Sequence, residues 1–264
     1  DDKIRQYTRT LEIKNVELEK INKELSSFTY ISSHDLQEPL RKIRTFTSRL
    51  MQTDLDNLSE GGKDYCRRLE ASAVRMQTLI RDIISYTSLS TDKSSCSECD
   101  LVELIDKVAR HYHEQLKERG GRIEIGRICR TEVIPDQFMQ LIGHLVSNSI
   151  KFASKKRPLV ISISGSVAER LPEPWQTEQM QGPYCELTVS DNGIGFEPRF
   201  NQQVFEVFQK LHGHDKYPGT GIGLAICKKI VENHHGFIRA QGELGKGTTI
   251  TLMFPVSAKP TVEN

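Results

Sequence analysis

The sequence predicts an α+β protein in which a helical N-terminal region precedes an α/β sandwich. Three observations predict this fold class. Apolar residues recur with a helical period as far as about residue 89, and a stretch of small polar residues, STDKSSCSEC, follows. Beyond it, helical patterns mix with short apolar or alternating strands. The 264 residues therefore divide into a coiled coil at 1–28, a helical hairpin at 29–90, a linker at 91–99 and a second domain at 100–264.

Composition and charge exclude several classes of protein. The 36 Lys and Arg residues nearly balance the 35 Asp and Glu residues, and a net charge of +1 argues against a nucleic-acid-binding module. Apolar runs of only a few residues exclude a membrane-spanning helix, and the N-terminus lacks the apolar core of a secretory signal. Six cysteines are too few for a disulfide scaffold, so we expect a reduced, cytoplasmic compartment. Because the sequence has no initiator Met, we expect it to belong to a longer chain.

The first 52 residues are expected to form one long helix. Ile4, Leu11, Leu18 and Leu25 recur every seven residues, and the flanking positions are charged. Such a helix has nothing of its own to bury this apolar seam against. The pattern at 1–28 therefore predicts a parallel coiled coil and a homodimer.

The region 29–90 is expected to be an antiparallel helical hairpin. The segment TDLDNLSEGG at 53–62 interrupts the helical pattern, and a second helical pattern runs from there to about residue 89. Two helices joined by a short loop form a hairpin, and two such hairpins pair into a four-helix bundle. The sequence thus predicts a dimeric bundle.

The domain at 100–264 is expected to carry its helices on one face of a sheet. Helices are predicted at 101–118, 135–153 and 221–234, and strands at 122–128, 159–167, 184–191, 236–243 and 247–254. The insert 168–183, which holds the only Trp, is interpreted as a surface loop. Cys96 and Cys99 form a CxxC with no second pair of ligands at a suitable distance, so we interpret them as exposed linker thiols rather than zinc ligands.

Glycine-rich segments carry much of the chemistry of this domain. Gly193 and Gly195 follow a predicted strand in DNGIGF, while Gly219, Gly221 and Gly223 precede a predicted helix in GTGIGLAI. Glycine lets the backbone approach a ligand closely, and the free amides at a helix N-terminus bind anions. Neither segment is a P-loop or a dinucleotide fingerprint, and neither alone specifies a nucleotide.

A polar helix face adds to this signal. In HLVSNSIKFA, His144, Asn148 and Lys151 fall on one face of a predicted helix. The neutral oxygen of Asn148 suits Mg²⁺ when phosphates supply most other ligands, and Lys151 can meet a phosphate. Apolar neighbours on the same helix make an ordinary solvent-exposed face the weaker interpretation.

Residues 100–256 resemble the ATP-binding domain shared by sensor histidine kinases and the gyrase, chaperone and mismatch-repair ATPases. The motifs that carry the resemblance occur in the family's order: the asparagine box around Asn148, DNGIGF, VFEVF, GTGIGLAI and GKGTT. The resemblance implies that Asp191 accepts a hydrogen bond from the adenine amino group and that Asn148 holds Mg²⁺. It further implies a flexible lid at 196–220. The other ATP-binding residues it implies are His144, Lys151, Phe152, Gly193, Gly195, Phe208, Lys210, Gly219, Thr220, Gly221, Gly223, Leu224 and Thr248.

Within this set the implied roles differ. Lys151 and Lys210 would meet phosphates, and Phe152 would pack beside the adenine. Phe205 and Phe208 would anchor the lid.

The N-terminal half of the sequence distinguishes the histidine kinases from the other ATPases of this family. SSHDLQEPLRKI at 32–43 resembles the phosphoacceptor box of histidine kinases, in the form common in phytochrome-linked and hybrid kinases. The resemblance implies the transmitter region of a sensor histidine kinase, which passes the γ-phosphoryl group of ATP to His34 and then to an aspartate of a response regulator. An upstream sensor domain would lie outside this sequence.

The phosphoacceptor residues suit this chemistry. Imidazole is a nitrogen nucleophile that is largely neutral near pH 7, and Asp35 could hold one ring N–H and offset the charge that develops on His34. Two positions depart from the family pattern: His144 stands where Asn is common, and Glu38 stands where Thr or Asn is common. Glu38 is expected to weaken phosphatase activity, or simply to pair with Lys42 one helical turn away.

Two other functions compete with the kinase. A silent scaffold would bind nucleotide without phosphorylating, and a chaperone- or gyrase-type ATPase would release free phosphate. The intact His34, Asp35 and Asn148 argue against the scaffold, and the phosphoacceptor box argues against the ATPase.

Overall fold

The computed structural model describes residues 35–89, 95–171, 175, 182–211, 217 and 219–256, together with the single residues 7 and 14. The chain forms two compact units, 1–92 and 93–264. The coiled coil predicted at 1–28 and the predicted phosphoacceptor His34 lie outside the described residues, apart from helical residues 7 and 14.

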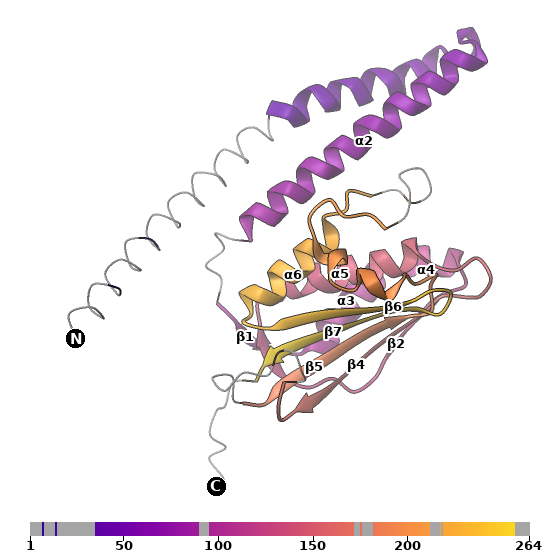
Figure 1. Ribbon diagram of the computed structural model, residues 1–264. Coiled ribbons are helices and arrows are strands. Elements are labelled where there is room, and N and C mark those ends of the chain that lie inside the picture. Colours follow the sequence, from indigo (N-terminus) through magenta and orange to yellow (C-terminus); the bar gives the residue numbers. More distant parts are fainter. Residues whose placement is uncertain are drawn as a thin grey trace. The chain divides into compact units, whose positions relative to one another are not determined.

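The first unit contains the predicted helical hairpin (Figure 1). Residues 35–53 are helical, the 3₁₀ turn η1 spans Leu55–Asn57, and helix α2 spans Glu60–Ser88. The Ser59 hydroxyl caps α2 by accepting a hydrogen bond from the Gly62 amide at 3.1 Å. Leu40 of the first helix packs with Ala73 and Ile80 of α2 to form the buried seam. Because the two helices bury only a narrow seam, large apolar side chains stay exposed on the hairpin, namely Leu36, Phe46, Leu50, Leu69 and Met76.

The second unit is built on a five-stranded sheet in the order β2-β4-β5-β7-β6. Its strands are β2 (Arg122–Ile125), β4 (Val160–Ala168), β5 (Tyr184–Asp191), β6 (Phe237–Glu243) and β7 (Gly247–Pro255). β2 runs parallel to β4, and the other neighbours are antiparallel. A separate two-stranded sheet pairs β1 (Ser97–Cys99) with β3 (Thr131–Val133).

The helices cover one face of the large sheet, as the sequence predicts. They are α3 (Leu101–His111), α4 (His113–Glu118), α5 (Pro135–Lys151) and α6 (Gly223–Asn233), and Figure 1 shows α3, α5 and α6 on the same side of the strands. The central strand β5 turns Cys185, Leu187 and Val189 into the core between sheet and helices. The α+β sandwich is therefore confirmed.

Short elements account for the differences from prediction. The helix expected at 101–118 is divided at Tyr112, and the strand expected at 122–128 ends at Ile125. Residues 97–99, assigned to the linker, form strand β1, in which Cys99 is paired with Thr131. Three-residue strands show no alternation, and their pairing depends on distant sequence, so their pattern gave no signal.

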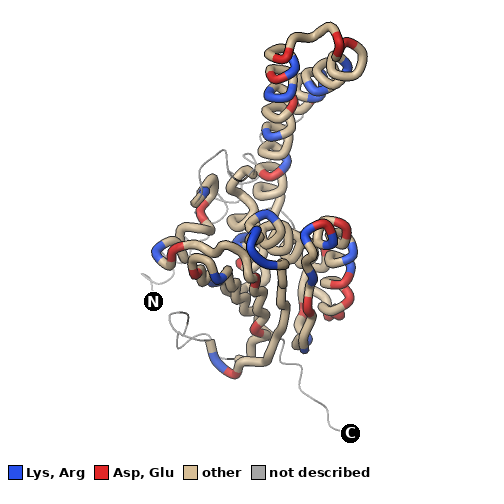
Figure 2. The backbone as a smooth tube through the Cα atoms, turned by 90° about the vertical axis from the view of Figure 1, so that its right-hand side faces the viewer, with Lys and Arg blue, Asp and Glu red and all other residues tan. Residues whose placement is uncertain are grey.

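Charge is mixed over both units. Figure 2 shows Lys and Arg interspersed with Asp and Glu along the hairpin and across the second unit. This distribution agrees with the balanced composition, and within the described part of the chain Figure 2 shows no unit that carries charges of one sign alone. Among the described helices, none is long and apolar enough to cross a membrane.

Candidate functional site

The carboxylate of Asp191 lies at the end of β5, half-buried against α5. The Gly193 amide donates to its Oδ1 at 2.8 Å, and the Ser149 hydroxyl donates to its Oδ2 at 3.0 Å. Burial raises the pKa of Asp191, while the hydrogen bonds from Gly193, Ser149 and the Thr248 backbone oppose that rise. The carboxylate is thus a fixed acceptor in a partly desolvated position.

The loop after Asp191 is held rigidly. Asn192 accepts from the Val160 amide and donates to the Pro158 carbonyl, each at 2.9 Å, and the Ile194 amide donates to the Phe152 carbonyl at 2.9 Å. A Cβ on Gly193 would lie 2.6 Å from that same carbonyl, so a side chain does not fit there. The motif's glycine is therefore required by the close approach of the end of α5.

Arg157 joins this loop to the turn between β6 and β7. Its guanidinium donates to the carbonyls of Asn192 and Gly193 at 2.8 and 3.2 Å, and to those of Gly245 and Lys246 at 2.6 and 3.0 Å. One side chain thereby holds the DNGIGF and GKGT segments together.

The polar face of α5 carries His144, Asn148 and Lys151, all half-buried. Burial lowers the pKa of Lys151, and the nearby charge of Lys210 lowers it further. A Cβ on Gly219 would lie 2.5 Å from Lys151 Nζ, so the glycine loop rests directly on the amine. Two cations that repel each other beside a half-buried glycine loop form an environment that favours an anion.

The GTGIGLAI loop brings α6 to the same place. Gly221 has a φ of +82°, and a Cβ there would lie 2.9 Å from the Phe208 backbone. A Cβ on Gly223, the first residue of α6, would lie 3.3 Å from His144 Nδ1. The Thr220 hydroxyl accepts from the Ile222 amide at 3.4 Å. Among the described residues, no side chain caps the N-cap position of α6, so the helix start suits an anion.

The predicted residues of α5, of the loop after β5 and of the start of α6 therefore lie at one edge of the second unit. Phe152 is the C-cap residue directly after α5, and its ring centroid lies 4.6 Å from Lys151 Nζ and 5.1 Å from the Tyr217 ring. Leu224 is half-buried in the first turn of α6, and Gly195 has a φ of +61° in the loop after β5.

The first half of the predicted flexible lid at 196–220 is packed against the rest of the unit. The short turns η2 (Pro198–Phe200) and η3 (Gln203–Phe205) pack against β6 and α6, and Phe196 and Val204 are buried. Phe208 is 58% exposed with a φ of +66°, so it does not anchor the segment in this structure. Residues 212–216 of the predicted lid lie outside the described residues.

Sequence reasoning missed three contributors to this site. Ser149 occupies the buried face of α5, where its hydroxyl resembles any other helix serine in sequence. Arg157 and Tyr217 act on segments far from them along the chain. The position of Ser149, next to Asn148 on the same helix, is the one signal that could have identified it.

The helix of the predicted phosphoacceptor box is described from Asp35 onward. Asp35 and Glu38 are exposed. Glu38 forms an ion pair with Lys42 at 2.9 Å, which is the simpler of the two expectations for this residue.

Comparison with known proteins finds a matching family for each of the two units. Residues 133–258 match the family described as histidine kinase-, DNA gyrase B- and HSP90-like ATPases, and residues 24–92 match the His Kinase A phosphoacceptor domain. The phytochrome-like protein Cph1 of Synechocystis is 37% identical over 90% of this chain and 30% of its own length. Cyanobacterial phytochrome A of Nostoc is 35% identical over 92% of this chain and 30% of its own length.

Solved structures share the fold. Full-length ShkA, in complex with AMPPNP, superposes with a TM-score of 0.62 at 20% identity, covering 88% of this chain and 46% of its own. The Acinetobacter baumannii histidine kinase AdeS gives a TM-score of 0.53 at 15% identity, covering 83% of this chain and 98% of its own.

A phosphoacceptor hairpin followed by an ATPase domain of this type defines the transmitter region of a sensor kinase. The chain belongs to the histidine kinases. It spans about a third of the length of the curated relatives that it matches.

Proposed function

We propose that this chain transfers the γ-phosphoryl group of ATP to His34 and passes it on to an aspartate of a response regulator. The observation that carries the proposal is the convergence of Asp191, the polar face of α5 and the start of α6 within an ATPase-type domain. The proposed divisions are the coiled coil 1–28, the hairpin 29–90, a linker that ends before β1, and a catalytic domain that runs from β1 to residue 264. ATP and a response regulator would be met in the cytoplasm.

The nucleotide would bind through contacts that match its parts. The fixed Asp191 carboxylate would accept a hydrogen bond from the adenine amino group, and Phe152 would pack beside the ring. The phosphates would lie between Lys151 and Lys210 and against the amides at the start of α6, which offer positive charge and free donors. The AMPPNP in the ShkA complex, an analogue of ATP, supports a nucleotide of this class.

The donors present suit Mg²⁺. Asn148 offers a neutral amide oxygen on the same helix face as Lys151, and Mg²⁺ commonly takes one or two protein oxygens, with phosphates and water completing its shell. His144 offers nitrogen, which Mg²⁺ does not prefer, so Asn148 would be the protein ligand. The bound ion would neutralise charge on the phosphates.

The transfer itself asks little covalent chemistry of the protein. A neutral imidazole nitrogen of His34 would attack the γ-phosphorus, and the bond to the oxygen that bridges the β- and γ-phosphates would break, releasing ADP. Asp35 would offset the positive charge on the ring. Lys151 and Lys210 would hold the phosphates in position.

A homodimer would complete the active form. The exposed Leu36, Phe46, Leu50, Leu69 and Met76 give the hairpin apolar surface that a second hairpin could bury.

Incubation with γ-labelled ATP and Mg²⁺ tests the proposal. Acid-labile, base-stable label is expected on the protein, and His34→Ala should abolish it while leaving ATP affinity within about threefold, because His34 lies outside the ATP domain. Free phosphate alone would indicate an ATPase, binding without either product would indicate a scaffold, and unchanged labelling of His34→Ala would remove His34 as the acceptor.

A further inference from the structure

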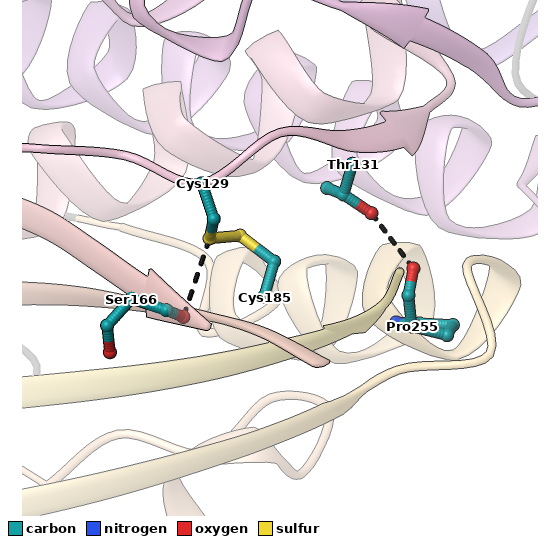
Figure 3. The surroundings of a disulfide bond; sticks show 5 residues. All are labelled: Cys129, Thr131, Ser166, Cys185 and Pro255. Carbon is teal, nitrogen blue, oxygen red and sulfur yellow. Dashed lines mark hydrogen bonds between the residues drawn. A yellow bond between two sulfur atoms is a disulfide. The ribbon is translucent and has the colours of Figure 1, made fainter. Parts of the chain in front are cut away.

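A disulfide joins two parts of the catalytic unit that no step of the proposed reaction uses. Cys129 and Cys185 are bonded, with their Cα atoms 5.7 Å apart and a sequence separation of 56. Cys185 is fully buried at the start of β5, and Cys129 lies half-buried in the connection from β2 to β3 (Figure 3). Of the two bonded residues, Cys129 keeps some exposed surface and Cys185 keeps none.

The connection from β2 to β3, which carries Cys129, is held against the sheet by hydrogen bonds. The Gly126 amide donates to the Ile163 carbonyl at 2.8 Å, and the Gly165 amide donates to the Arg127 carbonyl at 2.7 Å. Farther on, the Thr131 hydroxyl donates to the Pro255 carbonyl at 2.9 Å, as Figure 3 shows. Between these anchors, the disulfide is the covalent attachment of the connection to β5.

Cys129 is one of the residues that line a pocket of about 540 Å³. The pocket is lined by Glu98, Cys99, Asp100, Leu101, Val102, Ile128, Cys129 and Arg130, all within the catalytic unit. Cys99 lies on β1, two residues before the start of α3, where the chain first enters this unit. The pocket is therefore large enough for a small molecule and borders the partly exposed residue of the disulfide.

We propose that this pocket is a redox site, in which a small dithiol reductant opens the Cys129–Cys185 bond by attacking the Cys129 sulfur. One thiolate of the reductant bonds to Cys129 Sγ, and the sulfur–sulfur bond breaks, so that Cys185 leaves as a thiolate and takes a proton. The second thiolate of the reductant then attacks its own sulfur bound to Cys129, closes a cyclic disulfide and releases Cys129, which is protonated in turn. Two electrons and two protons pass from the dithiol to the protein.

The attack is assigned to Cys129 because access decides which sulfur is reached. Cys185 has no exposed surface, whereas Cys129 borders the pocket. Gly165 allows the sulfur to sit close to the sheet, since a Cβ there would lie 3.4 Å from Cys129 Sγ.

Opening the bond weakens the packing of β1 and β3, where the chain enters the catalytic unit. It leaves the proposed nucleotide-binding residues in place. β3 follows Cys129 and pairs with β1, so a freed connection weakens the support of the strand that leads in from the linker. Asp191 lies at the opposite end of β5 from Cys185. The reduced protein is therefore expected to lose stability around β1 and β3 without a matching loss of nucleotide affinity.

The test uses the full chain, oxidised and then treated with dithiothreitol. Thiol alkylation with peptide mass mapping should find Cys129 and Cys185 blocked together before treatment and labelled together afterwards. The melting temperature should fall by about 5–10 °C on opening, because the bond closes a long loop in the unfolded chain. Hydrogen exchange should quicken at 97–99 and 126–133.

Two pairs of variants give the controls. Val102→Trp fills the pocket and should slow opening about fivefold or more, whereas Leu244→Trp, in the exposed turn between β6 and β7, should leave the rate within about twofold. Cys129→Ser should abolish the redox shift in melting temperature, whereas Cys99→Ser, in the same pocket, should keep it. Any one of three results would overturn the proposal. The first is that Cys129 and Cys185 are free in the oxidised chain, and the second is a redox shift that survives Cys129→Ser or vanishes in Cys99→Ser. The third is an equal rate of opening in the two Trp variants.

Discussion

The Ser149 hydroxyl donates a 3.0 Å hydrogen bond to Oδ2 of Asp191, across 42 positions of sequence. Ser149 also contacts the Leu145 carbonyl of its own helix at 3.1 Å, so its position is set by α5. Helix α5 carries the residues that are proposed to bind phosphate and Mg²⁺. It therefore also orients the carboxylate that is proposed to bind the adenine. The two ends of the nucleotide would be recognised from one rigid element.

Ser149→Ala is expected to weaken nucleotide binding about 3- to 10-fold. The variant removes a donor from a partly buried carboxylate, a loss of roughly 1 kcal/mol. Calorimetric titration with a non-hydrolysable ATP analogue measures the change. Ser147→Ala, at an exposed position of the same helix, is the matched control and should bind as the wild type does. Equal affinities in both variants would contradict a role for Ser149.

Asp191→Asn is expected to weaken binding more strongly, by about 5- to 150-fold, because the adenine amino group would lose its charged acceptor. The apo protein should keep its melting temperature, since burial raises the pKa of Asp191 and the amide removes a poorly solvated charge. The amide can still accept from Gly193 and donate to Ser149. Loss of stability together with binding would indicate a merely structural carboxylate.

Lys151→Ala is expected to reduce affinity for ATP and ADP several-fold and to leave adenosine binding unchanged. Lys151 lies against the Gly219 loop and beside Lys210, so its charge would act on phosphate rather than on the base. Lys156→Ala, an exposed lysine in the turn after α5, provides the control. An equal loss for adenosine and ATP would place Lys151 elsewhere in the site.

The sequence could predict the elements that are long enough to show a period. The helices at 135–151 and 223–233 and the strands around Asp191 follow from local patterning, and the motif residues they carry meet as expected. Arg157 could not be predicted, because its partners Asn192 and Gly245 lie 35 and 88 positions away. The Cys129–Cys185 bond was unforeseen for the same reason, since cysteine count alone carries no information about which strands become neighbours.

Acidification is expected to destabilise the catalytic unit through His234. The ring accepts from the Ile134 amide at 2.9 Å and lies 2.7 Å from the Ile230 carbonyl, which fixes a neutral tautomer that joins the start of α5 to the end of α6. Burial lowers the pKa of His234, the Ile230 hydrogen bond opposes this, and His235 adds to it. Below its ordinary value of about 6.5, the unfolded chain binds a proton that the folded chain excludes, so stability falls as the pH falls.

Chemical denaturation between pH 5 and pH 8 measures this effect. The free energy of unfolding should decrease as the pH drops below about 6.5 and should be insensitive to His234 ionisation above it. His234→Gln should be less stable at pH 8, because two buried hydrogen bonds are altered, and should show a flatter pH profile. His113→Gln, at an exposed position of α4, should keep the wild-type slope. An unchanged slope in His234→Gln would assign the titration to another group.

The last prediction concerns Glu38, one helical turn after the proposed phosphoacceptor. Glu38 pairs with Lys42 at 2.9 Å on an exposed helix face. Thr or Asn at this position could orient a water toward a phosphorylated regulator without adding charge, whereas a carboxylate would repel the anionic phosphoryl group. The chain is therefore expected to favour kinase over phosphatase activity, with little acceleration of regulator dephosphorylation.

The decay of a separately phosphorylated regulator, with this protein and ADP, measures that balance. Glu38→Thr should accelerate the decay several-fold over the wild type, while Glu38→Ala should change it little, because alanine removes the charge without supplying a hydroxyl. Glu103→Ala removes an ion pair of the same spacing, with Lys107 at 2.8 Å on α3, and controls for a lost surface interaction. Strong acceleration by the wild type that Glu38→Ala abolishes would reverse the assigned role, since the carboxylate itself would then be activating the water.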